Sequence, residues 1–414
     1  MQHWLIIIFT ICFLKLEGQT YQEFKSKEVG CVEFHREGFN LSFPVIELMG
    51  IKNVNLRFDI FGNNQDILYY EVELCDFNWT PVSIDKLDYL EGFFGNTVDV
   101  FSTSIITTTD YVQYRLQIPN NDLNILMPGN YIVRVFRTNQ KIDTLLQRKF
   151  VVYDERIKTD IKYKKLQSGL YGDRQEFEVV LQTQSISFSD LIGNIKLCII
   201  QNNNWNTSRF YDNYTTDGNN AVIFSLSGQI VYNGINEFRI FDTKSLKYDS
   251  ERVDYIDYKA PNYHVYLKPD KLRGDKQYFS SEDLNGLFFI GNQESRYEDL
   301  MDTDYAFVHF TLHTGVPLPF DIYIEGALTE WKYSQNYMVF DPETGNYKAA
   351  LFLKQGLYNY RYAAKEYDSS TIEYDITEGN YYETKNQYMA IVYYRDLGEE
   401  YYYPIGVGSI NTGD

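Results

Sequence analysis

Apolar and polar residues alternate with a period of two along much of the chain. In Leu68–Leu74 apolar side chains occupy every second position, and Glu71 and Glu73 lie between them. Val54–Ile60 alternates in the same way. This pattern is typical of a strand with one buried and one exposed face. Helical periodicity is scarce, so the pattern predicts a chain built from strands.

Further segments carry the same signal, separated by turn-forming residues such as those of Met127–Asn130. Short strands that recur with turn clusters between them predict β-sandwiches. The further predicted strands are Tyr111–Ile118, Gly129–Phe136, Lys149–Tyr153, Phe177–Leu181, Ile195–Ile200, Asn236–Phe241, Tyr305–Leu312, Phe320–Glu325, Tyr347–Leu353, Leu357–Ala363 and Gln387–Arg395.

The predicted fold class is all-β, with tandem Ig-like or early-set β-sandwich domains. A chain of 414 residues has room for about three domains of ordinary size. We expect an N-terminal sandwich over residues 19–154, a middle sandwich over 155–260 and a C-terminal early-set Ig-like sandwich over 261–414. Aromatic residues make up 17% of the chain, with 38 Tyr and 28 Phe, and this enrichment also favours sheets.

Residues 1–18 are predicted to be a secretory signal peptide. The apolar run Trp4–Leu14 is too short to span a bilayer, and Gly18 provides a small residue at the expected cleavage point. Removal of this segment takes away Lys15 and Glu17, so the net charge stays at −19. A chain this acidic is repelled by nucleic acids and by anionic lipid surfaces.

Three cysteines remain after the predicted signal, namely Cys31, Cys75 and Cys198. One disulfide is compatible with this number, with Cys31 and Cys75 as the first candidates, and the sequence does not decide whether they are bonded. The odd count and the lack of a spacing pattern favour free buried thiols over a disulfide framework.

The sequence contains no motif of catalysis. It has no nucleophile elbow, phosphate-binding loop, dinucleotide fingerprint or zinc-protease motif. His309 and His313 lie on a predicted strand, where four residues separate the imidazoles by roughly 13 Å, too far to share a metal ion. The acidic run Asp299–Asp304 lacks the glycine and the terminal glutamate of a calcium loop. We therefore predict no catalytic, cofactor-binding or metal site.

The predicted C-terminal domain contains a strand that leads into Gly326–Trp331, followed later by Lys354 and by Gly356–Tyr360. This order resembles the early-set Ig-like glycogen- and starch-binding modules. In such modules an exposed tryptophan stacks on sugar rings. Trp331 and Lys354 are the candidate sugar contacts, and the alternative is that Trp331 packs in the sandwich.

A set of blocks in sequence order resembles the plug protein family of the type IX secretion system. Each block is weak alone, but together they extend over nearly the whole chain after the signal. The blocks are Tyr69–Pro81 with its Cys-Asp-Phe-Asn-Trp-Thr-Pro, Tyr89–Phe93, Tyr114–Asn120, Pro128–Tyr131, Asn203–Asn206, Asn236–Asp242, Asp283–Gly286, Leu328–Trp331, Lys354–Tyr360, Glu378–Asn380 and Tyr393–Arg395.

The resemblance implies a non-enzymatic protein that binds the large outer-membrane β-barrel translocon and seals its periplasmic opening at rest. It implies a location in the periplasm, peripheral to the outer membrane, without lipid insertion, nucleic acid or cofactor. The shared residues are expected to be structural, with Trp79 and Trp331 in cores and Gly92, Gly129 and Gly356 at turns. The partner-binding residues are unknown. The alternative function is a periplasmic or surface carbohydrate-binding protein that uses the C-terminal domain.

Overall fold

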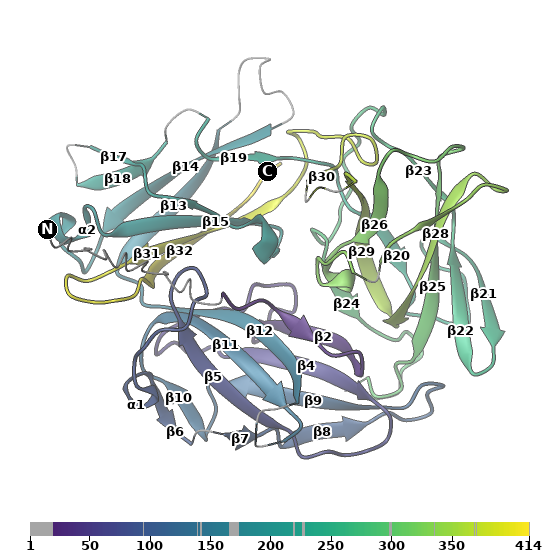
Figure 1. The fold of residues 1–414 in the computed structure, drawn as a ribbon, viewed down its shortest axis with the longest axis horizontal. Helices are drawn as coiled ribbons and strands as arrows, with labels where there is room; N and C mark the ends of the chain where they lie inside the picture. The colour runs from purple at the N-terminus through teal and green to yellow at the C-terminus, as the bar shows by residue number, and fades with distance from the viewer. Residues whose placement is uncertain are drawn as a thin grey trace, which may run out of the picture.

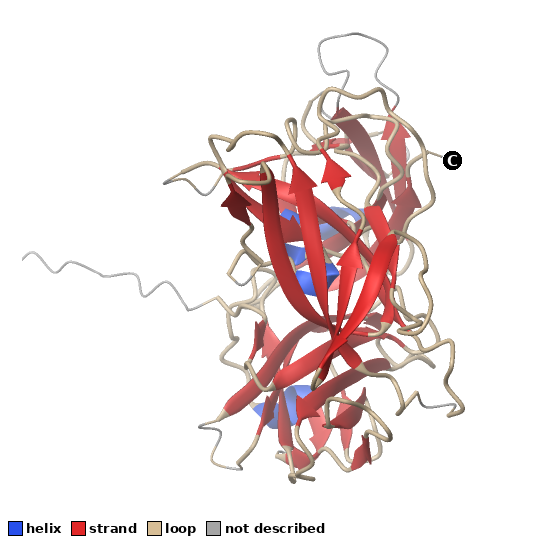
Figure 2. Cartoon of the chain, turned by 90° about the vertical axis from the view of Figure 1, so that its right-hand side faces the viewer, coloured by secondary structure: helices blue, strands red, loops and turns tan. Residues whose placement is uncertain are grey.

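The computed structural model describes residues 20–413, except residues 94, 139, 141–142, 165–173, 218–219, 226–227, 298–299, 335, 368 and 370. The predicted signal peptide lies outside the described residues. Strands dominate, and the helices are single turns (Figure 2). Figure 1 shows three bodies, with the first at the bottom, the middle one at the upper left and the third on the right. The all-β class is therefore confirmed.

The first sandwich packs the sheet β1-β12-β11-β5-β7, which β3 extends, against the sheet β2-β4-β9-β8, and a β6-β10 pair lies beside them. Most neighbours are antiparallel, and β3 pairs with β12 in parallel. Its elements are β1 Phe24–Lys25, β2 Val29–Arg36, β3 Val45–Glu47, β4 Val54–Phe61, β5 Tyr69–Cys75, α1 Lys86–Tyr89, β6 Leu90–Gly92, β7 Asn96–Thr97, β8 Val100–Thr103, β9 Tyr111–Ile118, β10 Leu123–Ile125, β11 Gly129–Phe136 and β12 Thr144–Tyr153.

The middle sandwich consists of the sheet β13-β14-β18-β17, with β19 beside β14, and the sheet β16-β15-β31-β32. Its apolar core is continuous with that of the first sandwich. Its elements are β13 Ile157–Lys164, β14 Arg174–Thr183, α2 Phe188–Leu191, β15 Ile195–Gln201, η1 Trp205–Thr207, β16 Arg209–Tyr211, β17 Thr215–Thr216, β18 Ala221–Phe224, β19 Val231–Asn233, β31 Gln387–Tyr394 and β32 Tyr403–Asn411.

The third sandwich packs the sheet β21-β22-β25-β28-β27, with β23, against strands that pair around β29. It has an apolar core of its own. Its elements are β20 Arg239–Asp242, β21 Val253–Lys259, β22 Asn262–Leu267, β23 Asp270–Lys271, β24 Phe288–Ile290, β25 Tyr305–His313, β26 Asp321–Glu325, η2 Ala327–Thr329, β27 Val339–Asp341, β28 Asn346–Lys354, β29 Gly356–Lys365 and β30 Ile372–Glu373.

Strand pairing divides the chain differently from the predicted boundaries of 155–260 and 261–414. The last strands, β31 and β32, leave the third sandwich and complete the middle one through pairing of β31 with β15, as the yellow strands beside teal β15 show (Figure 1). In the other direction, β20 pairs with β29, and β21 pairs with β22, so residues 239–259 lie in the third sandwich. Hydrophobic alternation identifies a strand but does not identify its partner, and the prediction assumed that each domain is continuous in sequence.

Each segment predicted as a strand contains a strand in the structure. Leu68–Leu74 corresponds to β5, and Val54–Ile60 corresponds to β4. The alternation arises because Val54, Leu56 and Phe58 are buried on one face of β4. Gly129 and Gly356 were expected at turns but are the first residues of β11 and β29.

Candidate functional site

Several of the sequence blocks that resemble the plug family meet where the three sandwiches contact one another. They come from all three bodies, and a shallow pocket between these bodies is lined by Lys149, Asn203–Asn206 and Glu330–Lys332. We call this region the junction. The blocks that contribute to it are Tyr69–Pro81, Asn203–Asn206, Asp283–Gly286 and Leu328–Trp331.

The first and middle sandwiches meet through an aromatic cluster. Trp79 is 6% exposed, and its ring lies edge-on to Trp205 with centroids 5.0 Å apart. Phe77 packs in the same manner against Tyr402, at 5.3 Å. The Lys149 ammonium lies 4.8 Å from the Trp79 ring. Trp79 is therefore buried as expected, but it lies between two sandwiches and not inside one.

Polar contacts fix the same interface. The Tyr393 hydroxyl donates to Asn130 Oδ1 at 3.0 Å, and the Tyr402 amide donates to Asp76 Oδ1 at 2.7 Å. Trp79 itself adopts φ of +67°, in the left-handed region that a bulky residue rarely occupies. These directional hydrogen bonds and the constrained backbone of Trp79 define one orientation of the first sandwich relative to the middle one. Apolar contact alone would not do so.

The first and third sandwiches meet through a buried ion pair. Lys354 Nζ lies 2.7 Å from Asp59 Oδ2, and the two side chains are 2% and 1% exposed. The Tyr305 hydroxyl donates to the same Asp59 oxygen at 2.6 Å and accepts from the Cys31 amide at 2.8 Å. A Cβ on Gly30 would come within 2.5 Å of the Tyr305 oxygen, so the close approach of the two bodies requires glycine there.

Glu330 links the same two sandwiches at the junction. It contacts Arg148 and Lys25 of the first sandwich and Lys332 of the third, the last at 2.7 Å. Burial alone raises the pKa of its carboxyl, but the three cations outweigh burial and hold the pKa at about 2. Glu330 and Trp331 both adopt φ of +55°.

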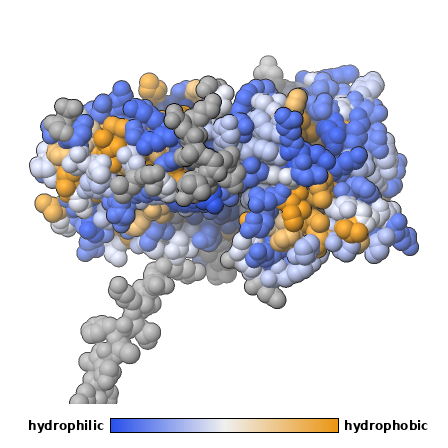
Figure 3. All heavy atoms as spheres, turned by 90° about the horizontal axis from the view of Figure 1, so that it is seen from above, coloured by the Kyte–Doolittle hydropathy of each residue, from blue (hydrophilic) through white to orange (hydrophobic). Residues whose placement is uncertain are grey.

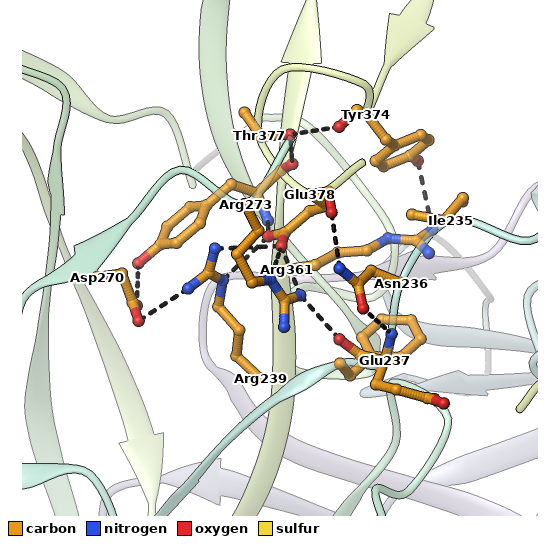
Figure 4. A network of polar contacts seen from close by, with 12 residues as sticks. Ile235, Asn236, Glu237, Arg239, Asp270, Arg273, Arg361, Tyr374, Thr377 and Glu378 are labelled. Atoms are coloured by element: carbon orange, nitrogen blue, oxygen red, sulfur yellow. Dashed lines mark hydrogen bonds and ion pairs between the residues drawn. The ribbon is translucent and has the colours of Figure 1, made fainter. Parts of the chain in front are cut away.

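A second polar network lies within the third sandwich (Figure 4). Glu378 is fully buried and is held by Arg239 at 3.1 Å and by Arg273 at 2.5 Å. Arg239 also contacts Asp270 at 3.0 Å. Burial raises the pKa of the Glu378 carboxyl, but the two guanidinium groups lower it by more. The pKa of Glu378 therefore lies below its ordinary value. This network joins the blocks Asn236–Asp242 and Glu378–Asn380.

Asp283 accepts from the Phe238 amide at 2.5 Å and from the Asn285 amide at 2.7 Å. Burial raises the pKa of Asp283 to about 7, because these two amides compensate only part of the lost hydration. The adjoining Gly286 lies against the Trp331 ring, where a Cβ would approach within 2.4 Å. Asp283 therefore holds a loop that supports the junction.

The two candidate sugar contacts are both buried. Trp331 is 8% exposed and packs edge-on against Phe238, with centroids 6.0 Å apart. Lys354 is 2% exposed and paired with Asp59. A sugar ring needs an open aromatic face, so the structure contradicts the role in sugar contact suggested for this pair.

His309, His313 and Asp304 make structural contacts. His309 Nε2 lies 2.9 Å from Nδ1 of His264, a contact that the sequence did not predict, and His313 contacts Asn346. Asp304 accepts from the Thr108 amide of the first sandwich at 2.7 Å. Asp299 lies outside the described residues. Among the described residues, no cluster of three or more His, Cys, Asp or Glu side chains could hold a metal ion.

The three cysteines are free thiols. Cys75 and Cys198 are buried, and Cys31 is partly buried beside Tyr305. Burial raises the pKa of all three thiols, to about 12 for Cys75. A thiol with a raised pKa is a poor nucleophile and a poor metal ligand.

In the part of the chain that the structure describes, no helix is both long and apolar enough to cross a membrane. Seen from above, the surface is mostly hydrophilic, with separate apolar patches on both upper bodies (Figure 3). Exposed large side chains of the third sandwich include Phe279, Val316 and Val339. The face seen in Figure 3 thus offers more than one candidate contact region.

The fold and the junction define an all-β protein of three sandwiches in fixed contact. A family model described as the type 9 secretion system plug protein 1st domain matches residues 29–154. This match over the first sandwich confirms the resemblance inferred from the sequence. A crystal structure of a hypothetical protein from Parabacteroides merdae ATCC 43184 is similar to the whole chain, with a TM-score of 0.89 and 28% identity over 95% of this chain and 100% of that one. No curated protein matches the chain.

Proposed function

We propose that the chain is a non-enzymatic plug, which binds the outer-membrane translocon of the type IX secretion system and seals its periplasmic opening at rest. The observation that carries the proposal is the family match over residues 29–154. The similarity of the whole chain to one solved structure supports a single architecture for all three sandwiches. Its location would be the periplasm, against the inner side of the outer membrane.

The junction is the structural feature that suits such a role. A seal must resist deformation over a wide opening, and independent domains on flexible linkers would not do so. Here the buried Lys354–Asp59 pair, the Glu330 cluster and the Trp79–Trp205 contact join the three bodies. The candidate sugar contacts are buried, so carbohydrate binding is not proposed.

Two experiments test the proposal. A tagged copy expressed from its own locus should co-purify with a very large outer-membrane protein after mild detergent extraction. Elution of the tagged chain alone would contradict it. Deletion of the gene should increase sensitivity to a bulky glycopeptide antibiotic that intact outer membranes exclude, whereas unchanged sensitivity would argue against sealing. A copy with Lys348→Met, altered at an exposed ion pair, should restore the resistance of the deletion strain and serves as the complementation control.

A further inference from the structure

A cleft of about 670 Å³ opens between the first and third sandwiches. One wall is formed by the start of β2, over residues 29–32, and the other by Ala350–Lys354 of β28. Phe61, Phe307 and Phe352 also line it, and each of these rings is partly exposed. A cleft with partly exposed aromatic side chains is a common form of binding site.

The cleft extends around the edge of β28. Successive residues of a strand point to opposite faces of the sheet, yet consecutive residues from Ala350 to Lys354 all line the cleft. Consecutive residues can all line one cleft only if the cleft reaches the edge of strand β28 as well as one face of its sheet. An extended ligand in the cleft would therefore lie beside the main chain of β28.

Much of that edge lacks a neighbouring strand. β28 pairs with β25 over its full length but with β27 only over Asn346–Lys348. Within the described residues, positions 349–354 thus have no paired strand on the side away from β25. An unpaired edge presents amide and carbonyl groups that can accept an additional strand.

The edge of β2 across the cleft is less available. Lys25 Nζ donates to the Gly30 carbonyl at 3.0 Å, and the Cys31 amide donates to the Tyr305 hydroxyl at 2.8 Å. The Gly30 carbonyl and the Cys31 amide therefore already have hydrogen-bond partners and are not free to pair with an added strand. On the free edge of β28 only the Lys354 carbonyl has such a side-chain partner among the described residues, the Tyr358 hydroxyl at 2.5 Å. The rest of this edge is consequently the one available for pairing.

The charge of the cleft is opposite to that of the protein. Its lining contains Lys25, Lys27, Lys332 and Lys354 but only one carboxylate, Glu330, whereas the whole chain has a net charge of −19. Lys354 is neutralised by Asp59, and Glu330 contacts both Lys25 and Lys332. When Glu330 is counted against the other three lysines, the lining keeps an excess of two positive charges. A ligand that uses this excess carries negative charge.

We propose that this cleft binds an extended acidic peptide segment of a partner protein, which adds as a strand to residues 349–354 of β28. Alternate side chains of the segment would contact Phe307 and Phe352, and carboxylates on it would face Lys27 and Lys332. Six residues of extended chain span about 20 Å. An acyl chain with an anionic head has no use for the free main-chain groups, so a peptide is favoured. The proposal does not depend on the plug function, because it specifies the chemistry of the segment and not the identity of its protein.

The test uses the mature chain and a fluorescein-labelled peptide of sequence Val-Glu-Val-Glu-Val-Glu, followed by fluorescence anisotropy. The peptide should bind, and a copy N-methylated at alternate residues should bind at least tenfold more weakly. A Val-Lys-Val-Lys-Val-Lys peptide should not bind. Lys27→Glu should weaken binding at least fivefold, whereas Lys268→Glu, at an exposed position outside the cleft, should not.

Hydrogen exchange locates the contact. Peptide addition should slow exchange of amides in residues 349–354 more than in β21, the edge strand at the other side of the same sheet. Equal affinity of the N-methylated peptide would overturn strand addition. Binding of laurate with no binding of the acidic peptide would overturn the proposal in favour of an amphiphile site. None of these outcomes bears on co-purification with a translocon, so the two proposals fail separately.

Discussion

Lys354 and Asp59 form an ion pair of 2.7 Å across the interface between the third and first sandwiches, with both side chains almost fully buried. The two residues lie 295 positions apart in sequence. Removal of one partner leaves the other charge buried without compensation, which is far costlier than loss of an exposed pair. The pair is therefore a sensitive measure of how firmly the two bodies are joined.

Lys354→Met is expected to lower the free energy of unfolding by about 3–5 kcal/mol, measured by urea unfolding at pH 7. A double variant with Asp59→Asn should recover much of this loss, because no unpaired charge remains and the amide oxygen still accepts from Tyr305. If the double variant were as unstable as the single one, the charge pair would not be the cause.

The matched control is Lys348→Met on the same strand. Lys348 contacts Asp341 at the same distance of 2.7 Å, but its side chain is 48% exposed. Solvent screens such a pair, so its loss should cost at most about 1 kcal/mol. Similar losses at Lys348 and Lys354 would show that burial does not control the effect.

Local pattern was sufficient to predict strands such as Val54–Ile60, because burial of one face imposes alternation on each strand separately. It was misleading for Asp59, which occupies a polar position on that strand and is nonetheless covered by Tyr305 and Lys354 of another sandwich. Which strands pair, and which polar faces are covered, depends on contacts between segments far apart in sequence. The return of β31 to β15 and the junction itself were unpredictable for this reason.

The sequence blocks that contain tryptophan also show that burial between separate bodies cannot be predicted from local pattern. A Trp or Lys in a turn-rich segment of an early-set sandwich suggests an exposed contact residue, and this suggested Trp331 and Lys354 as sugar contacts. The structure buries both against neighbouring bodies. A single sequence contains no signal for this burial, although the number of aromatic residues outside the strand cores, such as Trp79 and Trp205, was a hint that further surfaces are covered.

Glu330→Gln is expected to destabilise the protein by about 3 kcal/mol at pH 7. The folded pKa of about 2 lies below the ordinary value of 4.5, so the stabilisation is fully present above pH 4.5 and is lost as the pH falls toward 2. Urea unfolding should therefore show the difference from the unmodified chain shrinking to about 2 kcal/mol at pH 3.5. Glu343→Gln, at an exposed position, should show neither effect. A difference independent of pH would argue against the ionic role of Glu330.

Cys31, Cys75 and Cys198 should react very slowly with Ellman's reagent in the native protein at pH 8. Burial raises the pKa of each thiol, so the reactive thiolate is scarce, and Cys75 and Cys198 are in addition buried from the reagent. In 6 M guanidinium all three should react, because none is in a disulfide. Ser189→Cys, at an exposed position, serves as the reactive control. Rapid native reaction of one thiol without that substitution would show that the corresponding contact opens in solution.

The stability of the unmodified protein relative to the Asp283→Asn variant should be greater at pH 5 than at pH 8. Its folded pKa of about 7 lies above the ordinary value of 3.8, so the folded state binds the proton more tightly. The stabilisation is complete below pH 3.8 and is lost as the pH rises through 7, which amounts to about 2–3 kcal/mol between pH 5 and pH 8. The measurement is urea unfolding of both proteins across this range, with Asp275→Asn, 79% exposed at its side chain, as the control. Parallel curves for the Asp283 variant and the unmodified chain would mean that the carboxyl stays ionised in the folded state, held by the Phe238 and Asn285 amides alone.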